Sequence, residues 1–150
     1  MRKLKVWFMA LFVMLMATSL AYAGSFPTPS ITNFKKGDTY YNASYLYNCV
    51  FYARWLQPKL PSGLTTLADK KKKINSSTPK KKSVAILDIY GNIGHVAYVA
   101  DVDDSGKEKS ITLYEANYPS GVERKRVLKG KDKSIKDIGK KYGIIGYWKP

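Results

Sequence analysis

Cysteine, histidine and acidic residues are scarce in this chain of 150 residues. A single Cys cannot form a disulfide within the chain, which excludes a disulfide-stabilised scaffold. One His and one Cys, without a cluster of carboxylates, are too few ligands for a metal site, and we expect no cofactor. The 11 acidic residues stand against 26 basic ones, and the net charge of +15 indicates an acidic partner or surface but specifies no chemistry.

Long apolar runs are scarce as well. The longest, residues 6–17, follows three basic residues and precedes Ala21, Tyr22 and Ala23, which match the small-x-small pattern that a signal peptidase needs. The run is too short to span a bilayer, and no second run of membrane length follows it. We interpret residues 1–23 as a cleaved secretory signal, which predicts a secreted protein, periplasmic or extracellular, with no transmembrane segment after cleavage.

Two lysine clusters, residues 70–73 and 80–82, lie in a polar stretch from residue 63 to residue 82. This pattern favours a solvated surface loop, and the alternative is a patch that attracts anionic envelope polymers. Because the protein is expected to be exported, we expect no specific nucleic-acid partner, although basic residues bind any polyanion nonspecifically.

The rest of the chain is expected to be a short leader and one domain. Residues 24–33 carry two Pro and several Ser and Thr, so residues 24–39 are expected to be an extended leader. Residues 40–56 are rich in aromatic side chains and lack Pro and Gly, which predicts a helix that ends near Trp55 or Leu56. Residues 40–150 are expected to form the domain.

Short runs rich in β-branched and aromatic residues follow Pro79 and predict an antiparallel sheet. They are residues 83–89, 95–102, 110–116, 122–127 and 142–148. Residues 134–141 are compatible with a short helix, although Gly139 weakens it. A helix followed by a run of strands is the element order of an α+β domain.

Cys49 lies where a helix is expected to begin, with Asn48 as an acceptable N-cap. The helix dipole stabilises a thiolate at a helix N-terminus, which is how a nucleophilic cysteine is commonly prepared. The alternatives are an intermolecular disulfide partner and a buried spectator, because a free Cys packs as a small hydrophobic residue.

His95 opens an alternating apolar run, and the turn at residues 103–107 folds this run onto the next strand. Paired residue numbers then sum to roughly 210 to 212, which brings His95 opposite the region of Glu115 to Asn117. These two side chains point to one face because strand side chains alternate, but a slip of one residue would turn them away. With Cys49, these residues are the parts of a thiol hydrolase, namely a nucleophile, a base and a group that orients the base. The alternative is that they are structural.

These motifs resemble those of the CHAP family, the cysteine, histidine-dependent amidohydrolases and peptidases. The matching pieces are YNCVFYARW around Cys49, PKKKSVAIL from Pro79, GHVAYVADVDDSG around His95, and ITLYEAN, which carries Glu115 and Asn117. They occur in the family's order and cover most of the expected domain.

The resemblance implies a papain-like α+β fold, with an N-terminal helix that carries Cys49 packed on a small antiparallel sheet. It implies that Cys49 is the nucleophile, that His95 is the general base, and that Glu115 or Asn117 holds His95.

Two local features do not follow from the resemblance, the second donor to the oxyanion and the turn into the first strand of the sheet. The backbone N–H of Cys49 is the natural first donor to an oxyanion, while Asn48, Tyr47 and Asn42 are alternatives for the second donor. Many family members have Gly-Asp at the turn into the first strand of the sheet, where this chain has Lys-Ser. This departure concerns the local turn and leaves the expected catalytic residues unchanged.

Family members commonly cut amide bonds in bacterial peptidoglycan. The resemblance therefore implies an exported cysteine-dependent amide hydrolase, with a peptidoglycan amidase or endopeptidase as the first hypothesis. One alternative is a noncatalytic, basic cell-envelope-binding protein on the same fold. Another is an enzyme of the same chemistry that acts on a different amide, including a toxin directed at competitors.

Overall fold

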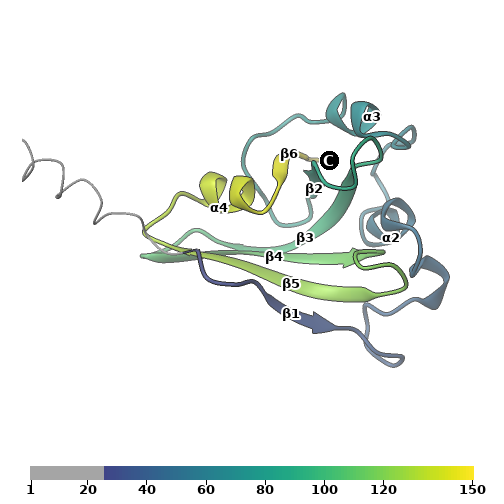
Figure 1. The fold of residues 1–150 in the computed structure, drawn as a ribbon, viewed down its shortest axis with the longest axis horizontal. Helices are drawn as coiled ribbons and strands as arrows, with labels where there is room; N and C mark the ends of the chain where they lie inside the picture. Colours follow the sequence, from purple (N-terminus) through teal and green to yellow (C-terminus); the bar gives the residue numbers. More distant parts are fainter. Residues whose placement is uncertain (1–25) are drawn as a thin grey trace, which may run out of the picture.

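The computed structural model describes residues 26–150, so the segment interpreted as a secretory signal, residues 1–23, lies outside the described residues. Within residues 26–150 the chain forms one six-stranded antiparallel sheet with short helices around it (Figure 1). The predicted α+β class and the antiparallel sheet are confirmed. No helix in this part of the chain is long and apolar enough to cross a membrane.

The six strands do not lie across the sheet in chain order. From one edge to the other they are β1 (Ser30–Asn33), β5 (Glu123–Lys131), β4 (Glu108–Ala116), β3 (His95–Asp103), β2 (Val84–Leu87) and β6 (Ile144–Trp148). The helical segments are η1 (Ala43–Tyr45), which is a short 3-10 helix, α2 (Cys49–Leu56), α3 (Leu67–Lys71) and α4 (Ile135–Lys141). Each predicted strand run overlaps one strand from β2 to β6, and the predicted short C-terminal helix is α4.

β1 lies within the segment predicted to be an extended leader. Its backbone is extended, but it is an edge strand of the sheet, with Ser30 paired to Val127 and Asn33 to Arg124 of β5. All four residues of β1 are exposed, so no alternating apolar pattern marks the strand in the sequence. The sheet therefore begins before residue 40.

The helix predicted over residues 40–56 is two shorter segments, η1 and α2. Asn42 caps η1 and Asn48 caps α2, because each side-chain oxygen accepts hydrogen bonds from backbone N–H groups that follow it. Asn48 has an extended backbone, with φ −146° and ψ 100°, which interrupts the helical path immediately before Cys49.

The polar stretch over residues 63–82, predicted to be a surface loop, contains α3. Thr66 and Asp69 form a capping box, in which Thr66 Oγ1 accepts the Asp69 N–H and Asp69 Oδ2 accepts the Thr66 N–H, both at 3.1 Å. Such caps stabilise a helix start by roughly 1 kcal/mol. Because α3 forms, Lys70 turns inward and is only 1% exposed, while the next two lysines are exposed. The prediction of a lysine surface cluster is thus wrong for Lys70.

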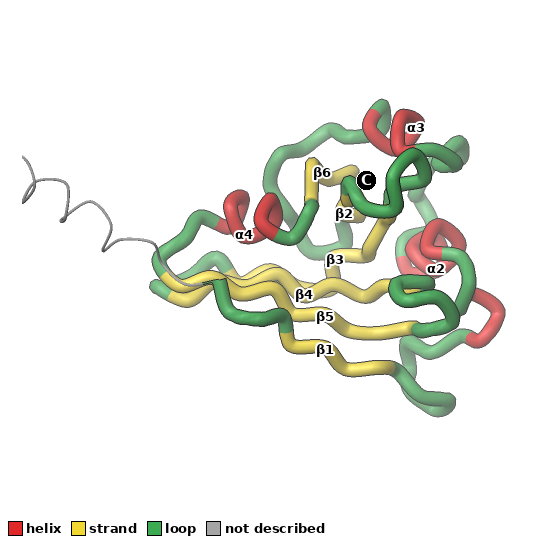
Figure 2. Tube along the Cα trace, in the orientation of Figure 1, coloured by secondary structure: helices red, strands yellow, loops and turns green. Residues whose placement is uncertain are grey.

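Two hydrophobic clusters lie on opposite faces of the sheet. Val84 and Ile86 of β2 pack towards α2, while Ala85 and Leu87 belong to the cluster under α4. β2 is consequently buried on both faces. Each fully buried aliphatic side chain contributes roughly 1.5–3 kcal/mol, so β2 is a strong anchor of the fold. Figure 2 shows α2 and α3 at the same end of the sheet, with α4 nearer the other end.

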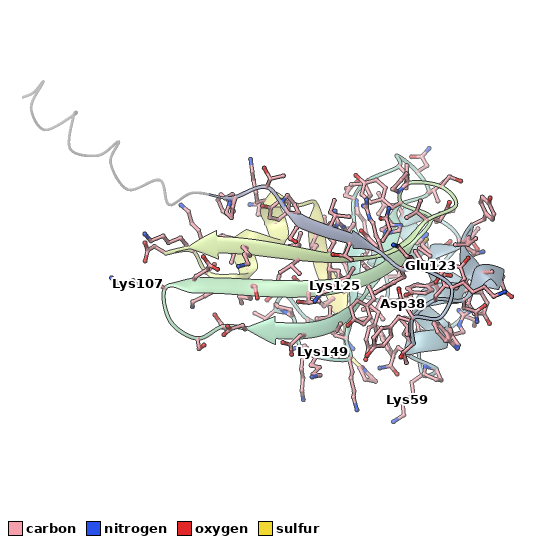
Figure 3. All side chains as sticks on the ribbon, turned by 90° about the horizontal axis from the view of Figure 1, so that it is seen from below. Asp38, Lys59, Lys107, Glu123, Lys125 and Lys149 are labelled. Carbon is pink, nitrogen blue, oxygen red and sulfur yellow. The ribbon has the colours of Figure 1, made fainter. Side chains whose placement is uncertain are left out.

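The β3–β4 hairpin sets the position of His95 relative to Glu115. Tyr98 pairs with Tyr114, a pairing at the upper limit of the range predicted from the sequence. Between this pair and the turn, a bulge shifts the pairing of the two strands. Figure 3 labels Lys107 at the tip of this hairpin. His95 begins β3 and Glu115 lies near the end of β4, so both residues lie at the end of the hairpin opposite its tip.

Candidate active site

Cys49 is the first residue of α2, and its backbone N–H is not among the groups that the N-cap residue binds. Asn48 Oδ1 accepts the N–H groups of Val50 and Phe51, both at 3.0 Å, and the Tyr52 N–H donates to the Asn48 carbonyl at 3.1 Å. Among the described residues, neither a side-chain oxygen nor a backbone carbonyl accepts a hydrogen bond from the Cys49 N–H. A helix start presents unpaired N–H groups and the positive end of the helix dipole, which favours negative charge on the thiol or beside it.

His95 lies between Cys49 and Glu115. Its Nε2 lies 3.1 Å from Glu115 Oε2, and the two side chains are 1% and 0% exposed. The Cys49 thiol lies close enough to the ring for each group to shift the pKa of the other, and because Glu115 takes Nε2, Nδ1 is the ring nitrogen left for the thiol. An ionised carboxylate only accepts hydrogen bonds, so Glu115 holds a proton on Nε2 and keeps Nδ1 available to the thiol.

Glu115 is held in turn by two arginines of β5. Arg124 Nε donates to Glu115 Oε1 at 2.9 Å, and Arg126 Nη2 donates to Oε2 at 3.0 Å. Both guanidinium groups lie over the ring of Tyr118, at 4.8 Å and 5.4 Å from its centroid, and the same ring lies 5.4 Å from the His95 ring. The carboxylate is therefore fixed by three charged or polar donors that are themselves packed.

These contacts shift the ionisation of the site. Burial raises the pKa of Glu115, but the hydrogen bond from His95 and the charges around it outweigh burial and bring this pKa below its ordinary value. Burial lowers the pKa of His95, and hydrogen bonds to Cys49 and Glu115 bring it above its ordinary value. Burial raises the pKa of Cys49, while His95, a backbone hydrogen bond and Lys70 bring it below the ordinary value. The site thus favours a thiolate beside an imidazolium.

Asn117, the other candidate to orient His95, does not lie beside Glu115 on the same face of β4. β4 ends at Ala116, and Asn117 then takes a left-handed backbone with φ 64°, its N–H donating to the Val122 carbonyl at 3.0 Å. This turn ends the strand alternation that would have placed it beside Glu115. Within residues 26–150 no hydrogen bond joins its side chain to His95, and Asn117 instead lines a pocket with Cys49.

That pocket opens beside Cys49 and has a volume of about 460 Å³. Tyr47, Phe51 and Ile93 line it and are 71%, 52% and 62% exposed. Large exposed side chains around a concave site are typical of a surface that contacts a ligand.

The pocket also narrows the alternatives for a second oxyanion donor. Tyr47 and Asn48 line it with Cys49. Asn42 is not among the lining residues, and its backbone N–H donates to Glu123 Oε2 at 2.7 Å. The geometry therefore favours Tyr47 or Asn48 over Asn42.

α3 holds the loop that leads into β3. The Leu67 N–H donates to the Asn92 carbonyl at 2.8 Å. Gly94, directly before His95, has φ 64°, and a Cβ on it would lie 2.7 Å from Leu67 Cδ1. Only glycine accepts both this backbone conformation and this close approach, so the contact between α3 and the loop fixes where His95 begins its strand.

Three residues of the site, Arg124, Arg126 and Lys70, are not predicted from the sequence. The two arginines alternate with Lys125 and so share a face of β5, but only the pairing of β5 with β4 shows that this face carries Glu115. Nothing in the run of lysines distinguishes Lys70 from its neighbours. No group of three or more His, Cys, Asp or Glu side chains in the described part of the chain is arranged to hold a metal ion.

The fold and the site define a class of protein, an α+β domain in which a thiol, an imidazole and a buried carboxylate meet beside a pocket. The family model for the CHAP domain matches residues 39–117, which confirms the resemblance. The chain belongs to the CHAP domain family, and this membership implies cysteine- and histidine-dependent amidohydrolase or peptidase activity. The match includes the thiol, the imidazole and the carboxylate, whereas the two arginines lie beyond it. No curated protein and no solved structure matches the chain significantly.

Proposed function

We propose that this protein is an exported, cysteine-dependent amide hydrolase that cuts peptidoglycan as an amidase or endopeptidase, on a papain-like arrangement of helix and sheet. The observation that carries the proposal is the chain of contacts from Cys49 through His95 to Glu115, which opens into a pocket at its thiol end. The basic charge of the chain supports an anionic, wall-associated substrate. Export rests on the pattern of residues 1–23, and amino-terminal sequencing of the exported protein is expected to start at Gly24.

In the proposed reaction the Cys49 thiolate attacks the carbonyl carbon of the amide. The C–N bond of the tetrahedral intermediate breaks, the electron pair stays on nitrogen, and the His95 imidazolium gives its proton to the leaving amine. Water then attacks the thioester while His95 takes its proton, and the Cys49 sulfur leaves as a thiolate as the carboxylic acid is released. The Cys49 N–H donates to the oxyanion in both steps.

Exposed lysines are proposed to hold the protein near anionic wall polymers. With Lys70 buried, the clusters are residues 71–73 and 80–82, and Lys71, Lys72 and Lys81 are paired with carboxylates at 3.2 Å, 3.9 Å and 3.5 Å. The remaining lysines leave both clusters positive. Retention of the protein on purified wall is expected to weaken from low to physiological ionic strength, and equal retention at both would contradict this role.

The test compares reduced protein without residues 1–23 and its Cys49→Ala variant on purified peptidoglycan. Mass spectrometry of the released fragments and of new amino termini identifies the bond that is cut. We expect fragments from the wild type alone, with thermal unfolding showing that the variant remains folded. Cleavage by both proteins would contradict the nucleophile. Absence of cleavage by either, with both retained on the wall at low salt, would favour the noncatalytic binding alternative.

A further inference from the structure

The pocket beside Cys49 has an unbalanced charge. Two cationic side chains, Arg54 and Lys70, are among its lining residues, and none of these residues, all within the described part of the chain, is Asp or Glu. Arg54 is held in place because its Nη2 donates to the Pro61 carbonyl at 2.9 Å and its Nε to the Leu60 carbonyl at 3.3 Å. These carbonyls orient the guanidinium but do not neutralise it.

Lys70 is the more unusual of the two cations because it is buried. Its side chain is 1% exposed, and its Nζ donates to the carbonyls of Ile93 at 2.7 Å and Thr65 at 3.2 Å. An ammonium group has three N–H donors, so these two acceptors leave one donor unused. Lys70, Thr65 and Ile93 all line the same pocket, so the lysine and the residues that accept from its ammonium form part of one wall.

No carboxylate balances this charge. Within residues 26–150 no carboxylate oxygen lies within 4.0 Å of Lys70 Nζ, whereas its neighbours Lys71 and Lys72 each pair with an aspartate. The adjacent Asp69 is engaged in the cap of α3, where its Oδ2 accepts from the backbone and side chain of Thr66. The Cys49 thiolate acts on this ammonium through its charge, but among the described residues no anion is hydrogen-bonded to it, and its presence at a pocket suggests an anionic partner that arrives from outside.

We propose that Lys70 makes this pocket selective for substrates that carry a carboxylate close to the scissile amide, with Arg54 as a second cation of the same pocket. The substrate carboxylate would accept the unused N–H of Lys70 and balance its charge. As a statement about a hydrolase substrate this rests on the proposed function, but the charge preference of the pocket is a property of the folded protein and is testable without turnover.

The test uses two alkylating reagents of nearly the same size, iodoacetate, which carries a carboxylate, and iodoacetamide, which is neutral. Rate constants for alkylation of Cys49 in the purified protein are measured with both, and their ratio is normalised to that of glutathione. Lys70→Met is expected to lower the iodoacetate to iodoacetamide ratio by about tenfold, because a unit charge that lines the same pocket as the thiol attracts only the charged reagent. Lys70→Gln, which keeps amide donors without charge, is expected to lower it equally.

Lys72→Met is the matched control, since it removes the same charge from the exposed end of the same helix and is expected to leave the ratio unchanged. An unchanged ratio in both Lys70 variants would overturn the proposal. An equal shift in the pH dependence of alkylation for both reagents is expected as well, because Lys70 lowers the pKa of the Cys49 thiol. Such a shift with an unchanged ratio would show that Lys70 acts on the thiolate alone, and it would overturn the proposal.

A measurement on the wild type covers the case in which the Lys70 variants do not fold. Glutarate is expected to slow the alkylation of Cys49 by iodoacetamide, and glutaramide, its neutral diamide, is not. Equal protection by both compounds, or by neither, would overturn the proposal. These rates depend on the thiol and not on cleavage of a substrate. A protein that fails to cut peptidoglycan but shows the charge preference would therefore contradict the proposed function and still support the carboxylate preference of the pocket.

Discussion

His95 separates two regions of the site that handle charge differently. On the carboxylate side, Glu115 is fully buried and accepts hydrogen bonds from His95, Arg124 and Arg126. On the pocket side, Lys70 is equally buried, yet its ammonium meets only backbone carbonyls among the described residues. In the first region each charged group meets a group of opposite charge within the protein, whereas in the second the ammonium is hydrogen-bonded to no anion among the described residues.

The comparison shows that two tasks of the site are divided between different residues. The carboxylate side orients the imidazole and depends on residues of β4 and β5, which the sheet holds in register. The pocket side faces the ligand and depends on α2, α3 and the loops beside them. Substitutions on the carboxylate side should therefore change stability and ionisation, while those on the pocket side should change the response to ligands in a protein that stays folded.

Glu115→Ala is expected to have the largest effect on stability. It leaves Arg124 and Arg126 buried without their acceptor, which should lower the free energy of unfolding by about 3–5 kcal/mol. Urea unfolding measures this value. Glu108→Ala is the matched control on the same strand, because the Glu108 carboxylate pairs with Lys129 at 2.7 Å but is 61% exposed, and the expected loss is below about 1 kcal/mol. Equal losses would show that the buried network is no stronger than a surface ion pair.

The pH dependence of stability gives a second, smaller effect on the same side. The pKa of Glu115 in the folded protein lies below its ordinary value of 4.5. On acidification, Glu115 is therefore protonated at a higher pH in the unfolded chain than in the folded protein. The contribution of the Glu115 carboxylate to the free energy of unfolding is fully present above pH 4.5 and is lost as pH falls through the pKa of Glu115 in the folded protein. The difference in unfolding free energy between the wild type and Glu115→Gln should therefore shrink on acidification, measured by urea unfolding from about pH 6 to about pH 2. A difference that stays constant would contradict the lowered pKa.

The parts of the site that depend on local sequence are predictable. Asn48 predicts the start of α2 because an N-cap acts on the residues directly after it. The turn after β3 predicts the register near His95 to within one residue, because a short hairpin has few ways to close and the bulge between Val99 and Asp101 then shifts the pairing. What fails is the assumption that the alternation continues to Asn117, since β4 ends one residue earlier in a left-handed turn.

The parts that depend on long-range contacts are not predictable from one sequence. β1 pairs with residues more than 90 positions away and carries no apolar pattern of its own. Lys70 is buried because α3 turns it towards the carbonyl of Ile93, and a five-residue helix is too short to show a periodic signal. Arg124 and Arg126 have an alternating pattern that is visible, but the sequence does not say which face of β5 meets Glu115.

Asn117 provides the smallest and most specific test of the division between the two regions. Asn117→Gly removes the side chain and keeps the left-handed backbone at φ 64°, which alanine would strain. Because Asn117 lines the pocket and has no hydrogen bond to His95 among the described residues, the free energy of unfolding should change by less than about 0.5 kcal/mol. The pH dependence of Cys49 alkylation should stay the same, and KM for the cleaved substrate should rise by less than about tenfold. A shifted pH dependence would instead show that Asn117 acts on the ionisation of Cys49 and His95, which a residue that only lines the pocket does not do.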